Sequence, residues 1–84
     1  MKLVLVLAFL LNINTATLEE LDTLPGIGPV LAGRIIQFRE RRGGFRRIEE
    51  LLAIPGISEA RWQVLRELVV VEEVKEVEPG ATGR

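Results

Sequence analysis

The feature that most constrains this chain is a glycine-rich turn that occurs twice. Residues 24–28, Leu-Pro-Gly-Ile-Gly, return thirty positions later as residues 54–58, Ile-Pro-Gly-Ile-Ser, and residues 18–21 return as 48–51 at the same offset. Self-similarity at a fixed period indicates duplicated supersecondary units. A Gly-x-Gly turn that opens a helix also presents unpaired backbone N–H groups at a positive helix end, which favours an anion such as phosphate. The repeat therefore predicts two related turns, each suited to a phosphate.

The residues around the first turn predict two helices. Thr17 followed by Glu20 fits a capping box, so a short helix is expected over about 18–23. Pro29 suits the first position of the next helix, where no N–H is missed. That helix should run to about Arg42, where a Gly-Gly pair ends it.

The second copy predicts a matching pair of helices. One is expected over about 47–53 and the other over about 59–68, with Ser58 as the helix cap in place of the second glycine. Trp62 stands at an apolar-stripe position, which favours the core over stacking on a nucleic-acid base. Residues 69–71, Val-Val-Val, fit either a short strand or a frayed helix end.

Composition excludes several classes of chemistry. The 84 residues include no Cys and no His, which removes disulfides, thiolate nucleophiles, histidine bases and most zinc sites. Formal net charge is −1, but residues 34–66 hold eight Arg against four Glu, for +4, whereas 67–84 come to −3 and 1–33 to −2. The middle of the chain is therefore basic and both ends are acidic.

Three segments are expected along the chain. Residues 1–11 place nine apolar positions, 3–11, behind Lys2, which resembles a signal-peptide start and is too short for the roughly 20 residues of a membrane span. Export or membrane association through residues 3–11 competes here with an apolar strand or helix packed on the domain and with a misplaced gene start. Residues 12–71 are expected to form the domain, and 72–84 an acidic, disordered tail.

Further positions complete a pattern known from one family. The matching residues are Asn12, Ile13, Asn14, Thr15, Ala16, Glu20, Leu21, residues 24–28, Ala32, Ile35, Ile36, Arg39, Gly43, Gly44, Phe45, Glu50, Leu51 and residues 55–57. In these residues the chain resembles the tandem helix-hairpin-helix domain of ComEA-type competence proteins, over about residues 12–71. The resemblance implies an all-α, SAM-like bundle of four to five short helices. It also implies binding of double-stranded DNA without sequence preference, in DNA uptake during natural transformation.

The same resemblance implies which backbone groups contact phosphate. They are the amides of Gly26, Ile27, Gly28 and Val30 in the first hairpin, and of Gly56, Ile57, Ser58 and Ala60 in the second. The side chains of Ile27 and Ile57 would point inward as core plugs. In related hairpins a monovalent cation sits between turn carbonyls and phosphate, and the sequence does not show whether one binds here; no other cofactor is expected.

Arginines supply the candidate charge contacts. Arg61 follows the second turn directly, whereas relatives often place Lys after the first turn and this chain has no cation there before Arg34. The second hairpin is therefore expected to carry more of the charge-dependent affinity. Arg46 and Arg47 fit either a phosphate contact or a solvated loop that pairs with Glu49 and Glu50.

Other charged residues favour structural roles. Arg39, Arg41 and Arg42 fit the solubilised end of a helix better than a phosphate contact. The pairs 19–20 and 49–50, both Glu-Glu, lie at helix starts, where they complement the helix dipole, so no metal site is expected from them.

Three classes of function compete. The leading one is a non-specific duplex-DNA-binding module, with partners in the DNA-uptake machinery and a periplasmic or cell-surface location. The second class is a protein-interaction or assembly module of the same fold, and a DNA-repair accessory is a further alternative role. The alternative location is the cytoplasm. An enzyme is the third class, and with glutamates already explained as helix caps no catalytic residue is expected.

Overall fold

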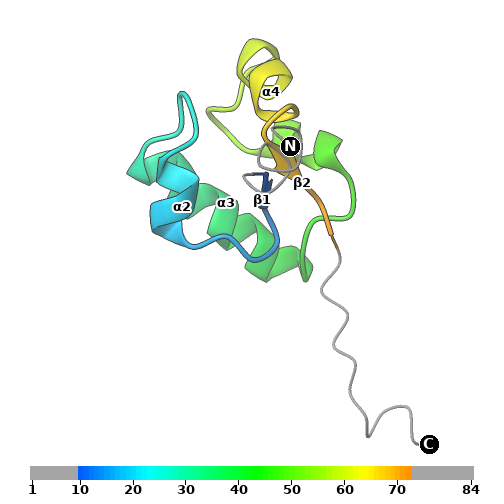
Figure 1. Cartoon of the computed structure of the whole chain (residues 1–84). Helices are drawn as coiled ribbons and strands as arrows, with labels where there is room; N and C mark the ends of the chain where they lie inside the picture. The colour runs from blue at the N-terminus through cyan, green and yellow to red at the C-terminus, as the bar shows by residue number, and fades with distance from the viewer. Residues whose placement is uncertain (1–9, 73–84) are drawn as a thin grey trace, which may run out of the picture.

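The computed structural model describes residues 10–72, within which three α-helices, one 3₁₀ helix and two short strands form a small helical domain (Figure 1). In chain order the elements are β1 (Leu11–Asn12), α2 (Leu18–Asp22), α3 (Pro29–Arg42), η1 (Ile48–Ala53), α4 (Glu59–Leu65) and β2 (Val69–Val70). The all-α class with four short helices is confirmed. Within these residues no helix combines the length and the apolar character needed to cross a membrane.

Local signals at the first helix pair act as the sequence predicts. The Thr17 hydroxyl accepts a hydrogen bond from the Glu20 amide at 3.1 Å, and the Glu20 carboxylate accepts one from the Thr17 amide at 2.9 Å. Helix α3 begins at Pro29 and ends where Gly43 adopts φ +78°, a left-handed conformation that glycine enters at little cost.

The second helix pair departs from the expected pattern. Residues 48–53 form a 3₁₀ helix, and α4 ends at Leu65, three residues before the predicted end at Leu68. The cause is the pairing of β2 with β1, because Val69 lies opposite Leu11 in a parallel register. The β-branched run therefore forms a strand, and the chain must leave the helix early to reach it.

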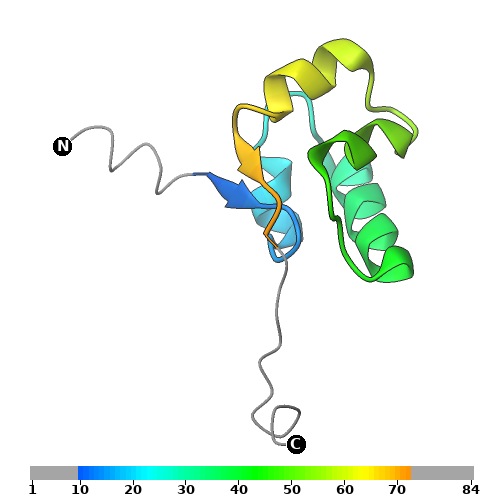
Figure 2. The same cartoon turned by 90° about the vertical axis from the view of Figure 1, so that its right-hand side faces the viewer.

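The strand pair joins the first and last described elements. The Leu11 amide donates to the Leu68 carbonyl at 3.1 Å, and the Ile13 amide donates to the Val70 carbonyl at 3.1 Å. Figure 2 shows the two arrows close together, in agreement with this pairing. The predictions for most of the apolar segment and for the acidic tail fall on residues 1–9 and 73–84, outside the described residues.

One core is shared by both helix pairs. Its buried hydrophobic members are Ile13, Ala16, Leu21, Leu24, Ile27, Ala32, Ile35, Phe45, Leu51, Ile54, Ile57, Trp62, Leu65 and Val69. Ile27 and Ile57 are both in it, as expected of core plugs, and so is Trp62, whose indole N–H donates to the Ile48 carbonyl at 2.9 Å.

Arg39 has a structural role that the sequence did not indicate. Its Nη1 donates to the carbonyls of Ile13 and Ala16, at 2.9 and 2.8 Å, and so ties α3 to the segment between β1 and α2. Arg39 is therefore a link within the domain rather than a solvated helix end.

Candidate nucleic-acid interface

The two glycine-rich turns pack against each other crosswise. Gly26 and Gly56 both adopt positive φ, at +77° and +101°. A Cβ on Gly26 would lie 2.7 Å from Nε of Arg61, and a Cβ on Gly56 would lie 2.5 Å from Cδ2 of Leu31. Leu31 and Arg61 are thirty residues apart, as the two glycines are. Each turn is thus packed against the helix of the other copy, as pseudo-two-fold symmetry requires.

The guanidinium groups of Arg34 and Arg61 both reach the second turn. Nη1 of Arg34 donates to the Pro55 carbonyl at 2.7 Å, and Nη1 of Arg61 donates to the Gly56 carbonyl at 3.0 Å. Arg61 also lies against Gly26 of the first turn. The sequence-based view that the first turn has no cation before Arg34 is therefore wrong, because the fold brings Arg61 to it.

These hydrogen bonds decide whether the second hairpin can hold a monovalent cation. The carbonyl oxygens of Pro55 and Gly56 already accept from guanidinium groups. A monovalent cation at those oxygens would be repelled by both positive charges, so this turn does not fit one.

Two of the eight predicted amides are not free. The Ile27 amide donates to the Leu24 carbonyl at 3.0 Å, and the Ile57 amide donates to the Ile54 carbonyl at 3.1 Å. Both bonds close the turns on themselves, and the buried side chains point these residues into the core. The prediction that these two amides contact phosphate is corrected: each Ile holds the shape of its turn.

The other predicted amides are open. Within residues 10–72 no hydrogen-bond partner is found for the amides of Gly26, Gly28, Val30, Gly56, Ser58 and Ala60. Unpaired N–H groups of this kind belong to the first turn of a helix and to the turn before it. The structure therefore brings together, on two adjacent turns, a set of donors available to an external acceptor.

The starts of α3 and α4 differ in their helix caps and in their charge. The Ser58 hydroxyl accepts from the Arg61 amide at 3.1 Å, whereas Gly28 has no side chain and leaves the equivalent Leu31 amide without a partner in the described chain. Helix α4 also carries the carboxylate of Glu59 at its first position, where α3 has Pro29. The Glu59 amide of α4 has no counterpart at Pro29, so the two starts present equal numbers of open donors, and an anion at the start of α3 differs in meeting no carboxylate.

Gly28 itself is not required by the internal packing. Its φ of −104° suits any residue, and a Cβ placed on it would meet nothing within 4 Å. The absence of a side chain at this open position leaves the backbone beside the unpaired amides accessible from outside. The two contrasts between Gly28 and Gly26, in φ and in surroundings, appear only in the tertiary structure.

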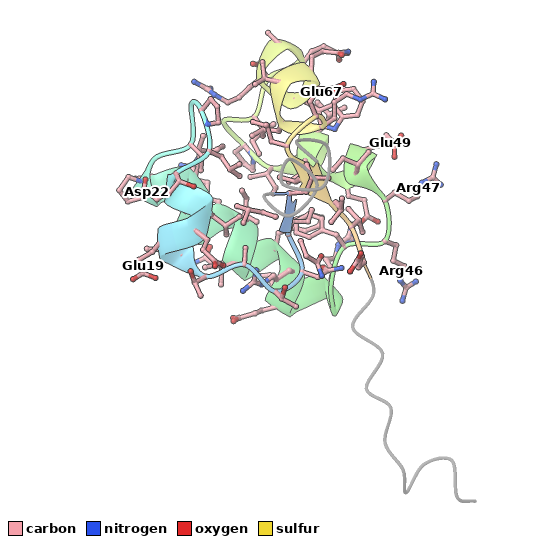
Figure 3. The ribbon with its side chains drawn as sticks, in the orientation of Figure 1. Glu19, Asp22, Arg46, Arg47, Glu49 and Glu67 are labelled. Carbon is pink, nitrogen blue, oxygen red and sulfur yellow. The ribbon has the colours of Figure 1, made fainter. Side chains whose placement is uncertain are left out.

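Arg46 and Arg47 do not join the turns. Figure 3 shows both side chains on the side of the molecule away from the turn between α2 and α3. Nε of Arg47 lies 3.9 Å from a Glu49 carboxylate oxygen, with both side chains mostly exposed, and the Arg46 backbone amide donates to the Glu50 carboxylate at 2.9 Å. This is the solvated-loop alternative for the two arginines.

The carboxylates of the described region do not gather. Within residues 10–72 no group of three or more Asp and Glu side chains is placed to hold a metal ion. Glu19 and Glu20 lie in the first turn of α2, and Glu49 and Glu50 in the first turn of η1, as dipole complementarity predicts.

Comparison with known proteins agrees with this architecture. The helix-hairpin-helix motif family matches residues 8–70, so the chain belongs to that family. It is 43% identical over 63 residues to ComE operon protein 1 of Bacillus subtilis, a match that covers 75% of this chain and 31% of the relative. It is 45% identical over 56 residues to endonuclease/exonuclease/phosphatase family domain-containing protein 1 of Xenopus laevis, which covers 67% of this chain and 10% of that protein.

A third relative is closer in size. An uncharacterized protein of Haemophilus influenzae is 43% identical over 61 residues, which is 71% of this chain and 54% of the relative. The chain thus spans about a third of the Bacillus protein and a tenth of the Xenopus protein. What the matches have in common is the helix-hairpin-helix region.

Proposed function

We propose that this chain binds double-stranded DNA without sequence preference, through backbone amides of its two hairpins. The observation that carries the proposal is the pair of adjacent turns with open amides, beside which the Arg34 and Arg61 guanidinium groups are held. Amide donors recognise phosphate oxygens, which are the same at every base pair and carry no sequence information. Membership of the helix-hairpin-helix family supports this reading. The module acts by binding and not as an enzyme.

The first hairpin makes the stronger phosphate contact in this proposal. The amides of Gly28, Val30 and Leu31 are open at the start of a 14-residue helix, with Arg61 close by. At the second hairpin the Glu59 carboxylate opposes an incoming phosphate. This order is the reverse of the one expected from the sequence, in which Arg61 follows the second turn. Arg46 and Arg47 are left out of the interface.

We further propose a role in DNA uptake. Its support is the similarity to ComE operon protein 1 of Bacillus subtilis, together with the apolar residues 3–11 behind Lys2, which suit export or membrane association. The chain would then act at the cell surface or in the periplasm and pass DNA to other proteins of the uptake machinery. Fractionation of native cells and N-terminal sequencing of the recovered protein test the location, and recovery from the cytoplasm with an intact N-terminus would contradict it.

Binding is tested by fluorescence anisotropy with two labelled duplexes of unrelated sequence. The informative substitution is Gly28→Glu, because the site is open and the backbone extended, whereas side chains at Gly26 or Gly56 would collide with Arg61 or Leu31. A carboxylate there should cost one or more charge-assisted hydrogen bonds of about 1.5–3 kcal/mol, which is about ten- to a hundredfold in affinity.

The matched control is Gly28→Gln, which has the same size and no charge. Both duplexes should bind the unaltered chain equally, and Gly28→Gln should weaken binding less than Gly28→Glu. Equal affinities for all three proteins, with folding verified by circular dichroism, would exclude the hairpin from the interface. Failure of the unaltered chain to bind either duplex at low salt would refute the function.

A further inference from the structure

We propose that α3 carries a second contact for the sugar-phosphate backbone of the same duplex, in a groove beside the second turn; this rests on the proposed function. The groove has a volume of about 380 Å³ and lies between the outer face of α3 and the end of η1. Its lining includes Arg34, Gln37, Phe38, Arg41, Arg42 and Pro55.

The positive charge of the groove favours a polyanionic ligand. Three of its lining residues are arginines and none is a carboxylate. Glu40, the acidic residue of α3, lines a different cavity together with Asn14 and Phe45. The depression at the first turn, the counterpart of the groove in the repeat, has a single arginine, Arg61. The three positive charges are therefore concentrated on one side of α3.

Two of the three guanidinium groups are already positioned. Nη1 of Arg34 is bonded to the Pro55 carbonyl at 2.7 Å, and the guanidinium carbon of Arg42 lies 4.9 Å above the ring centroid of Phe38. Phe38 is itself stacked on Phe45, with ring centroids 4.9 Å apart. Side chains held in this way lose less conformational entropy when a ligand binds.

The groove is continuous with the hairpins and yet lies outside the duplicated unit. Helix α3 has 14 residues and α4 has 7, so the second half of α3, with Arg41 and Arg42, has no helical counterpart in the other copy. Arg41 follows Arg34 by seven residues, about 10 Å along the helix axis. That distance is close to the axial rise of about three nucleotides of one DNA strand. A strand held at Arg34 can therefore continue along α3.

The test compares two double variants of the full chain that lose the same net charge. Arg41→Gln/Arg42→Gln removes two cations from the groove, and Arg46→Gln/Arg47→Gln removes two from the loop after α3, whose arginines do not line the groove. Duplex affinity is measured by fluorescence anisotropy at about six salt concentrations between about 0.05 and 0.5 M, the range in which phosphate contacts are lost.

The groove variant should lower the slope of log K against log salt by about 1.8, since each phosphate contact contributes about 0.9. Per tenfold dilution of salt, the variant therefore gains about 60-fold less affinity than the unaltered chain gains. The loop variant should leave the slope unchanged, and Arg41→Lys/Arg42→Lys should retain it. If the double groove variant is not folded, Arg41→Gln alone serves, because within residues 10–72 that guanidinium has no partner to lose; its expected loss of slope is about 0.9.

Equal slopes for the groove and loop variants would overturn the groove contact. In that case Gly28→Glu would still weaken binding, so the hairpin function would stand. Absence of duplex binding by the unaltered chain would overturn both proposals.

Discussion

Exchange of Gly28 for Ser should raise stability and weaken DNA binding at once. The backbone at Gly28, φ −104° and ψ −170°, is the extended conformation that Ser58 adopts at φ −82° and ψ 169°. A Cβ at Gly28 meets nothing within 4 Å. The new hydroxyl can therefore accept from the Leu31 amide, as Ser58 accepts from Arg61 at 3.1 Å.

The expected gain in the free energy of unfolding has two sources. A serine cap exceeds a glycine cap by a few tenths of a kcal/mol. Replacing a glycine at a compatible position adds about 0.4–1 kcal/mol by restricting the unfolded chain. The sum, about 1 kcal/mol, corresponds to about 4–8 °C in melting temperature for a domain of this size. The reciprocal exchange, Ser58→Gly, should lower the free energy of unfolding by a similar amount.

Urea unfolding followed by Trp62 fluorescence measures the stability change, because Trp62 is the one tryptophan of the chain and is buried. Duplex affinity of Gly28→Ser should fall about tenfold, since the Leu31 donor is occupied and worth about 1.5 kcal/mol or more to a charged acceptor. A loss of stability would show that the fold itself needs Gly28. A gain of stability with unchanged affinity would show that the start of α3 does not face phosphate.

Two further changes test the internal contacts. Arg39→Met should destabilise the domain by about 2–3 kcal/mol, because the carbonyls of Ile13 and Ala16 lose a charged donor; a urea midpoint equal to that of the unaltered chain would contradict this. Trp62→Phe should cost about 1–2 kcal/mol by leaving the Ile48 carbonyl without its donor. Thermal unfolding by circular dichroism measures it, and an unchanged melting temperature would show that water replaces the indole.

Much of the fold could be predicted because its signals are local. The Thr17 and Glu20 capping box, Pro29 at a helix start and Gly43 at a helix end each act over four residues or fewer, and all are found in place. The end of α4 could not be predicted in this way. It depends on Val69 pairing with Leu11, a contact across 58 residues that no helical periodicity encodes.

The candidate site, like the fold, has features that the sequence determined and features that only the tertiary structure decided. The sequence by itself determined that there are two related turns, and its resemblance to a known family implied that Ile27 and Ile57 fill the core. Repetition and residue type are properties of the chain, so they can be read without coordinates.

Only the tertiary structure decided which cation serves which turn and which glycine is free of internal constraint. Arg61 lies next to the second turn in sequence, yet the crosswise packing sets its side chain against Gly26 of the first. Gly26 and Gly28 look alike in the sequence, but one has Arg61 beside it and the other faces open space. Both results depend on how two distant segments pack, and sequence neighbourhood does not determine the direction in which a long side chain crosses between them.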